Sequence, residues 1–154
     1  MAVTPLNDAE TAAVAALLQS RRIEQVPTDV ARASAFMARA RDRIDQLSLL
    51  TSDAERYDVA YDAAHDVGEA LLAVHGYRTT NGAGQHEAVG RYLRAVLSTP
   101  PGDRAARRFD QLRRSRNQSH YQATPIGRAA SDQAESTARD LFAAAMARGL
   151  ALPS

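Results

Sequence analysis

Hydrophobic residues recur every three or four positions along most of the chain, which is the spacing of helices that bury one face. The clearest segment runs from about residue 28 to 49, and the next one, from Ser52 to Gly76, repeats its spacing. The apolar positions are Val30, Ala33, Met37, Ala40, Ile44 and Leu47 in the first segment, and Tyr57, Ala60, Ala64, Val67, Leu71 and Val74 in the second. Because only a short break around Thr51 separates them, we expect two helices that pair antiparallel.

Four further helices are expected, over about residues 8–24, 86–97, 103–119 and 129–148. Their apolar positions are Val14, Leu17, Leu18 and Ile23, then Val89, Leu93 and Val96, and in the last helix Ala134, Ala138, Leu141 and Ala145. Ser52 and Glu55 have the spacing of a capping box, Gly76 fits a left-handed cap, and Asp103 is the expected cap of its helix. Residues 77–85 and 123–127 read as a loop and a turn. No alternating strand pattern or repeat appears, so the sequence predicts an all-α fold, an up-down helical bundle of five to six helices.

Composition narrows the class of protein. A chain of 154 residues with 45% hydrophobic and 24% charged residues is typical of one folded domain, here residues 1–154. The absence of cysteine excludes disulfides and thiolate metal sites. Asp8 and Glu10 precede the first apolar run, which is the wrong charge for a signal peptide, and no run approaches membrane-spanning length. We therefore expect a cytoplasmic protein without membrane association.

The charge pattern singles out one basic segment. The net charge is only +1, so a polyanion site must be a local patch. All 19 basic residues are arginine, and six of them lie close together, at Arg104, Arg107, Arg108, Arg113, Arg114 and Arg116. On a helix, Arg113, Arg116 and His120 share one face, Asn117 borders it, and Tyr121 follows. Arginine beside histidine suits phosphodiester chemistry, but the same spacing also suits a solvated face or an intersubunit salt-bridge patch.

Acidic residues follow one side of the helix expected after Ser52. They are Asp58, Asp62, Asp66 and Glu69, spaced four, four and three residues apart. These carboxylates are candidates to orient the arginine cluster or His120, and the alternative is a solvated stripe or pairing with arginines of a neighbouring helix. With His65 they lack a recognised ligand pattern, so we predict no metal and no cofactor. His75 and His86 are expected to be structural or exposed.

Two stretches of the sequence resemble HEPN domains. The first is Arg-Tyr-Asp-Val-Ala-Tyr-Asp-Ala-Ala-His at residues 56–65, continuing through Glu-Ala-Leu-Leu at 69–72 to Gly-Tyr-Arg at 76–78. The second is the order of a loop, His86, a short helix, and then an Arg-Asn pair with His120 and Tyr121 before a last helix. The resemblance covers about residues 28–148, which leaves the helix over about 8–24 as an extra N-terminal element.

The resemblance implies a helical bundle that usually dimerises and brings two copies of a motif to one cleft. Many HEPN domains are metal-independent ribonucleases that act as toxins or in antiphage defence, and others bind RNA or nucleotides without cleaving. In the active ones an arginine, usually followed by a polar residue, precedes a histidine by four to six intervening residues. Arg116 is followed by Asn117 but leaves three residues before His120, whereas Arg114 and Arg113 leave five and six.

We therefore predict a HEPN-type RNA-acting protein, in its catalytic form a metal-independent endoribonuclease of a toxin–antitoxin or antiphage system. The catalytic candidates are His120, as general base or general acid, and Arg116, helped by Arg114 or Arg113, to bind the scissile phosphate. The candidates for binding RNA phosphates are Arg113, Asn117, Tyr121 and Arg108. The expected partners are a second copy of the chain, RNA or a nucleotide, and an antitoxin or neighbouring-gene protein. The alternative is a non-catalytic HEPN interaction module that binds a partner protein or a nucleotide.

Overall fold

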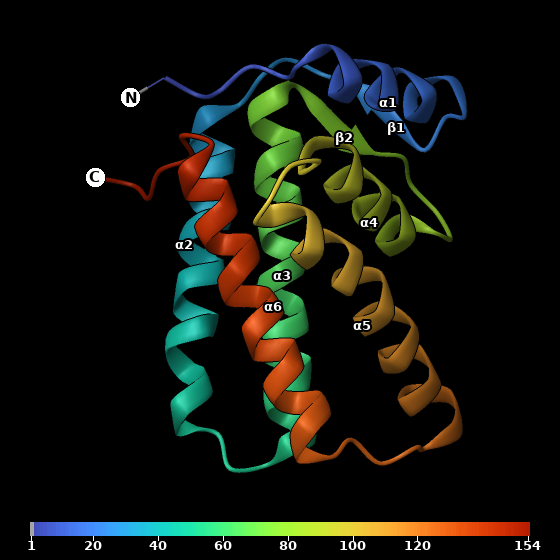
Figure 1. Cartoon of the computed structure of the whole chain (residues 1–154), viewed down its shortest axis with the longest axis vertical. Coiled ribbons are helices and arrows are strands. Elements are labelled where there is room, and N and C mark those ends of the chain that lie inside the picture. Colours follow the sequence, from blue (N-terminus) through green and yellow to red (C-terminus); the bar gives the residue numbers. More distant parts are fainter. Residues whose placement is uncertain (1) are drawn as a thin grey trace.

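The computed structural model describes residues 2–154, which form an all-α helical bundle, as predicted (Figure 1). Six helices are present in this part of the chain: α1 (Asp8–Gln19), α2 (Val30–Gln46), α3 (Asp53–His75), α4 (Gln85–Val96), α5 (Gly102–Gln122) and α6 (Arg128–Ala147). A 3-10 turn, Leu47–Leu49, follows α2 and leads into the short connection to α3. Within residues 2–154, no helix combines the length and apolar content needed to cross a membrane.

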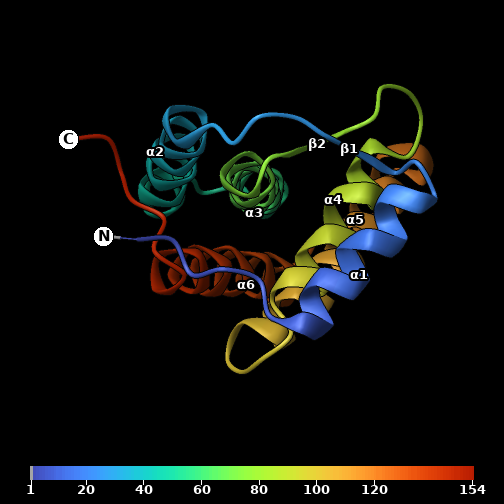
Figure 2. The same ribbon diagram turned by 90° about the horizontal axis from the view of Figure 1, so that it is seen from above.

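Helix α3 is the central element of the bundle. It packs against α2 and α6 and also contacts α4 and α5. Figure 1 shows α2, α3 and α6 running along the long axis, with α5 beside them and α1 across the upper end. From above, α1 and α4 lie side by side (Figure 2). Because α3 is surrounded, its side chains meet residues from four other helices, and all six of its predicted apolar positions are buried.

The caps predicted for α3 are present, but the cap predicted for α5 is not. The Ser52 side chain accepts a hydrogen bond from the backbone N of Glu55 at 3.3 Å, and Gly76 ends α3 with a φ of 86°, the left-handed conformation that favours glycine. The predicted cap at Asp103 is wrong. The helix already begins at Gly102, and the Asp103 backbone N donates to the carbonyl of Thr99, so Asp103 lies inside the first turn.

Two short strands correct the prediction that the chain has none. Strand β1 (Ile23–Gln25) pairs antiparallel with β2 (Tyr77–Thr79), so that Ile23 lies opposite Thr79. The first helix therefore ends at Gln19, before the predicted residue 24, and the predicted loop 77–85 contains β2. Strands of three residues are too short to show an alternating pattern, and their pairing depends on the distant ends of α1 and α3.

The predicted core positions are buried, with two departures. Leu18 is half-buried, and Val30, the first residue of α2, is 64% exposed. Spacing identifies the face on which a residue lies, but it does not show whether a neighbouring helix covers that end of the face. One hydrophobic cluster joins residues of all six helices, including Val14, Met37, Leu71, Leu93, Phe109 and Leu141.

Candidate functional site

Helix α5 carries the predicted site and is held against α3 by two tyrosines. The buried Tyr57 hydroxyl donates to the backbone carbonyl of Leu112 at 2.7 Å. One turn further along α3, the Tyr61 ring stacks on Phe109 with 5.3 Å between ring centres. These contacts fix the rotation of α5, so the residues one turn beyond Leu112 face α3.

Arg116, one turn after Leu112 on α5, also contacts this tyrosine pair. Its guanidinium carbon lies 4.9 Å from the centre of the Tyr61 ring, a cation–π contact. Its Nε lies 4.0 Å from Oδ1 of Asp58, too far for a hydrogen bond. This Nε is buried and has no hydrogen-bond partner among the described residues. A buried N–H donor without an acceptor is costly. The Nε itself is enclosed, so a ligand could contact Arg116 only through the remainder of its side chain, which is 26% exposed.

His120 meets the same carboxylate as Arg116. Its Nε2 lies 3.4 Å from Oδ1 of Asp58, and its side chain is 49% exposed. The predicted common face of Arg116 and His120 thus brings both residues to Asp58 of α3. Of the four carboxylates considered in the sequence, Asp58 is the one that orients this pair.

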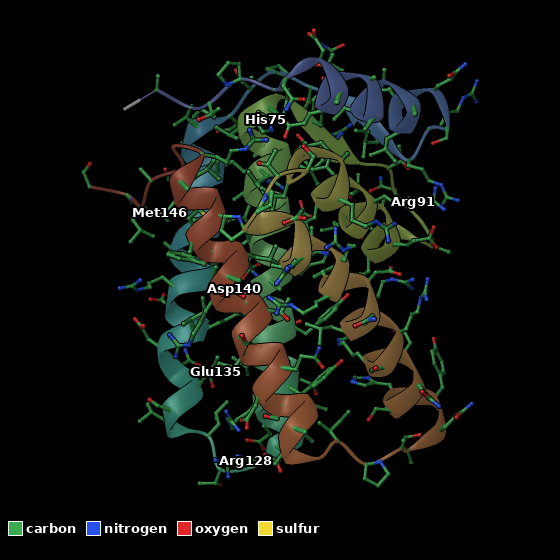
Figure 3. The ribbon with its side chains drawn as sticks, in the orientation of Figure 1. His75, Arg91, Arg128, Glu135, Asp140 and Met146 are labelled. Atoms are coloured by element: carbon green, nitrogen blue, oxygen red, sulfur yellow. The ribbon has the colours of Figure 1, made fainter. Side chains whose placement is uncertain are left out.

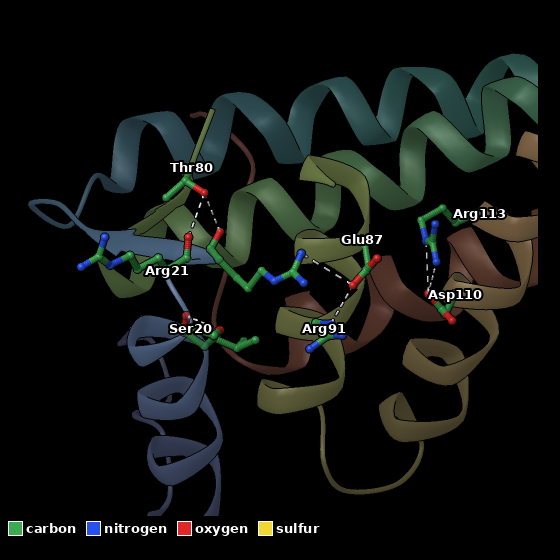
Figure 4. A network of polar contacts seen from close by, with 9 residues as sticks. Ser20, Arg21, Thr80, Glu87, Arg91, Asp110 and Arg113 are labelled. Carbon is green, nitrogen blue, oxygen red and sulfur yellow. Dashed lines mark hydrogen bonds and ion pairs between the residues drawn. The ribbon is translucent and has the colours of Figure 1, made fainter. Parts of the chain in front are cut away.

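Arg113 and Arg114 contact a different carboxylate, Asp110. Two nitrogens of Arg113 lie 3.1 and 3.2 Å from Oδ1 of Asp110, and Arg114 lies 2.9 Å from Oδ2 (Figure 4 shows the pair of Arg113 and Asp110). Arg94 of α4 approaches Asp110 as well, at 3.7 Å. Asp110 is nearly buried, whereas the Arg114 side chain is 72% exposed. Arg114 therefore keeps most of its side chain in solvent although it pairs with Asp110.

The other predicted RNA-binding residues do not converge on Asp58. Arg108 lies 2.5 Å from Asp140 of α6, which Figure 3 labels, and so it faces a different helix. Asn117 and Tyr121 are exposed, Tyr121 to 88%, and neither makes a side-chain hydrogen bond within residues 2–154. These two side chains remain free to contact a ligand at the exposed end of α5.

The remaining acidic residues of α3 do not contact the α5 arginines within the described chain. Asp66 is buried and pairs with two arginines of α2, Arg43 at 2.5 Å and Arg39 at 3.8 Å. Burial raises the pKa of Asp66, and these two arginines oppose that rise. Glu69 lines a separate hollow of about 390 Å³ between α2, α3 and β2. Asp62 is half-buried, and its backbone carbonyl accepts a long hydrogen bond from Arg43.

Three residues that the sequence did not assign to the site, Tyr61, His86 and His65, form a chain of contacts that begins at Arg116. Tyr61 Oη is 2.9 Å from Nδ1 of His86, and the His86 ring is 4.3 Å from the ring of His65. Burial, followed by the charges of His86 and nearby arginines, lowers the pKa of His65 to about 3. His86 comes from α4, so no spacing within one helix could have placed it beside Tyr61.

A hollow of about 320 Å³ lies between α3, α5 and α6, and its lining includes Tyr57, Arg114 and Ser115. Asp58, Arg116 and His120 do not line this hollow. Within residues 2–154, no group of three or more histidine or acidic side chains is arranged to hold a metal ion.

Comparison of the chain with known proteins gives no match among family models, curated proteins or solved structures. The functional interpretation therefore depends on the chemistry of the side chains around Asp58 and Tyr61.

Proposed function

We propose that this protein is a HEPN-type RNA-acting protein, a metal-independent endoribonuclease that works as a homodimer. The observation that carries the proposal is the meeting of Arg116 and His120, both partly exposed, at the same carboxylate oxygen of Asp58. A partly exposed arginine and a histidine that exposes half of its side chain are the two groups that cleavage at a phosphodiester needs side by side.

The chemistry follows from these two side chains. In this reaction the ribose 2′-hydroxyl attacks the neighbouring phosphorus, the bond to the 5′-oxygen breaks, and the products are a 2′,3′-cyclic phosphate and a 5′-hydroxyl. Negative charge accumulates on the phosphate oxygens in the transition state, and the guanidinium of Arg116 neutralises it. His120 transfers a proton, because an imidazole nitrogen can both accept and donate one.

The neighbouring residues of α5 supply binding contacts in this proposal. Arg114 is largely exposed, and an exposed ion pair contributes little to stability. Arg114 can therefore leave Asp110 and bind a phosphate at low cost in free energy. Asn117 and Tyr121 extend the exposed surface of the helix beyond Arg116. In a homodimer, a second copy of this surface would supply the other side of an RNA-binding cleft.

The test is to incubate purified protein with total RNA in the presence of a chelator and to compare the wild type with His120→Ala. The expected result is fragmentation by the wild type and, by the variant, cleavage that is at least about 100-fold slower. In a toxin–antitoxin or antiphage system, expression of the wild type alone would also arrest growth, and expression of His120→Ala would not. Intact RNA with both proteins, together with normal growth, would refute catalysis.

One observation favours a second candidate function, a non-catalytic HEPN module that binds a partner protein or a nucleotide. Several arginines of α5 are already paired with carboxylates. Arg107 contacts Asp103, Arg108 contacts Asp140, and Arg113 and Arg114 both contact Asp110. Such internal neutralisation weakens a phosphate-binding patch and suits a protein interface. The absence of cleavage, combined with dimerisation or capture of a partner that depends on α5, would select this candidate.

A further inference from the structure

The imidazole of His86 is held in one orientation beside the proposed cleavage site. Its Nδ1 lies 2.9 Å from Tyr61 Oη, and the two rings are parallel within 1° at 5.8 Å between centres. The ring of His65 also packs against the His86 ring, with 4.3 Å between the ring centres. His86 nevertheless remains only half-buried, in the first turn of α4. A histidine whose Nδ1 is held by a buried partner presents Nε2 for proton transfer.

Tyr61 connects His86 to the phosphate-binding arginine. The same phenol ring that contacts His86 carries the Arg116 guanidinium at 4.9 Å. Arg116 then approaches Asp58, and Asp58 contacts His120. The guanidinium therefore lies between two imidazoles along a chain of contacts, while Tyr61 itself is fully buried and cannot reach a substrate.

Cleavage of RNA through its 2′-hydroxyl needs a base for the attacking oxygen and an acid for the leaving oxygen. We propose that His86 is the general base of this reaction and that His120 is the general acid. This inference rests on the proposed ribonuclease function and deepens it by assigning the two proton transfers.

The proton balance of the step is as follows. His86 uses the tautomer in which Nδ1–H donates to Tyr61 Oη and Nε2 keeps its lone pair. Nε2 removes the proton of the 2′-hydroxyl, the 2′-oxygen bonds to phosphorus, and the bond from phosphorus to the 5′-oxygen breaks. The imidazolium of His120 gives its proton to the departing 5′-oxygen. Exchange with water returns both histidines to their starting states.

The charges around His86 agree with the role of a base. Burial lowers the pKa of His86 below its usual range, the positive charges of Arg116 and Arg113 lower it further, and Asp62 acts in the opposite direction. The neighbouring His65 is neutral above about pH 3, and burial raises the pKa of Tyr61, so its phenol stays protonated. A neutral His86 at pH 7 has the free lone pair that a base requires.

The leaving group separates the two roles. A ribonucleoside 3′-(4-nitrophenyl) phosphate releases nitrophenolate, which needs no proton, whereas RNA releases a ribose 5′-oxygen, which needs one. We expect His120→Gln to cleave RNA about 100-fold more slowly than the wild type. On the nitrophenyl substrate its rate should be much closer to that of the wild type. His86→Gln should lose about 100-fold on both substrates.

The matched control is His75→Gln, because His75 Nδ1 also lies 2.8 Å from a buried tyrosine hydroxyl, that of Tyr92, but at the other end of α3. Its rates should equal those of the wild type. Tyr61→Phe keeps the ring and removes the hydroxyl, and it should slow both substrates equally but less than His86→Gln does. Circular dichroism verifies that each variant is folded.

Two results would overturn the assignment of His86 and leave the ribonuclease proposal intact. One is a folded His86→Gln that cleaves at the wild-type rate, and the other is a His86→Gln that is slow on RNA but cleaves the nitrophenyl substrate nearly as fast as the wild type. A wild type that cleaves neither substrate would overturn the ribonuclease proposal and this inference with it.

Discussion

The guanidinium carbon of Arg116 lies 4.9 Å from the centre of the Tyr61 ring, and this contact sets the position of the charge that we assign to the scissile phosphate. The planar guanidinium both stacks on the ring and offers several N–H donors to an oxyanion, which a lysine ammonium cannot do in the same geometry. We predict that Arg116→Lys lowers RNA cleavage about 100-fold, as loss of an oxyanion donor does, with the melting temperature nearly unchanged.

The control for that variant is Arg107→Lys. Arg107 lies on the same helix, is 63% exposed and pairs with Asp103 one turn away. Its replacement should leave the cleavage rate at the wild-type value. Equal losses for the two variants would indicate that α5 contributes only general positive charge, and no specific role of Arg116 would remain.

The hydrogen bond from Tyr57 to the carbonyl of Leu112 should contribute measurably to stability because both groups are buried. Tyr57→Phe leaves that carbonyl without its partner, so we predict a decrease of about 1–2 kcal/mol in the free energy of unfolding, measured by urea denaturation. Tyr77→Phe is the control, since the Tyr77 hydroxyl makes no hydrogen bond within residues 2–154, and its effect should stay below about 0.5 kcal/mol. Similar values for both would show that the Tyr57 bond is not retained in solution.

Gly68 allows α4 to approach α3 closely, which brings His86 next to His65. A Cβ added at Gly68 would overlap the Cγ1 atom of Val89, one turn after His86. We predict that Gly68→Ala destabilises the protein by about 1–3 kcal/mol, as overpacking of a core does. Gly127→Ala provides the contrast, since nothing lies within 4 Å of an added Cβ there. A Gly68→Ala protein as stable as the wild type would mean that α3 and α4 have room for a methyl group at this position.

Much of the fold could be predicted because its signals are local. The apolar spacing of α2 and α3 and the caps at Ser52 and Gly76 depend on residues within one or two turns. The pairing of β1 with β2 depends on segments more than 50 residues apart, and three residues per strand leave no pattern to read.

The candidate site, too, could be predicted only where the signal lies within one helix. Helical spacing placed Arg116 and His120 on one face, and the structure brings both to Asp58. The place of Asp66 could not be predicted, because a stripe of carboxylates on one helix does not reveal which neighbour carries the arginines. Asp66 points toward Arg43 of α2, away from α5. Tyr61 and His86 were missed because they meet only when α3 and α4 pack together.

The buried His65 should make stability depend on pH. The unfolded chain binds a proton at a histidine near pH 6.5, whereas the folded protein holds His65 neutral because its pKa is about 3. The unfolded state therefore binds more protons between these values, and stability falls as the pH decreases from 6.5 toward 3, by at most about 1.4 kcal/mol per pH unit for this residue.

His65→Gln cannot take up that proton in either state. We predict that the loss of unfolding free energy between pH 7 and pH 5 is smaller in this variant than in the wild type. His75 and His86 keep part of the pH dependence, since burial lowers their pKa values as well. Urea denaturation at both pH values measures the difference. The same loss in both proteins would show that His65 is protonated in the folded state.

The most direct measurement is mass spectrometry of the ends produced from one short RNA and from the same RNA with a single 2′-deoxy residue at the cleavage position, both in chelator. If Arg116 and His120 support attack by the 2′-hydroxyl, the all-ribose strand yields a 2′,3′-cyclic phosphate and a 5′-hydroxyl, and the substituted strand stays intact at that position. Cleavage at the deoxy residue, products with a 5′-phosphate, or two uncut strands would contradict the proposed function.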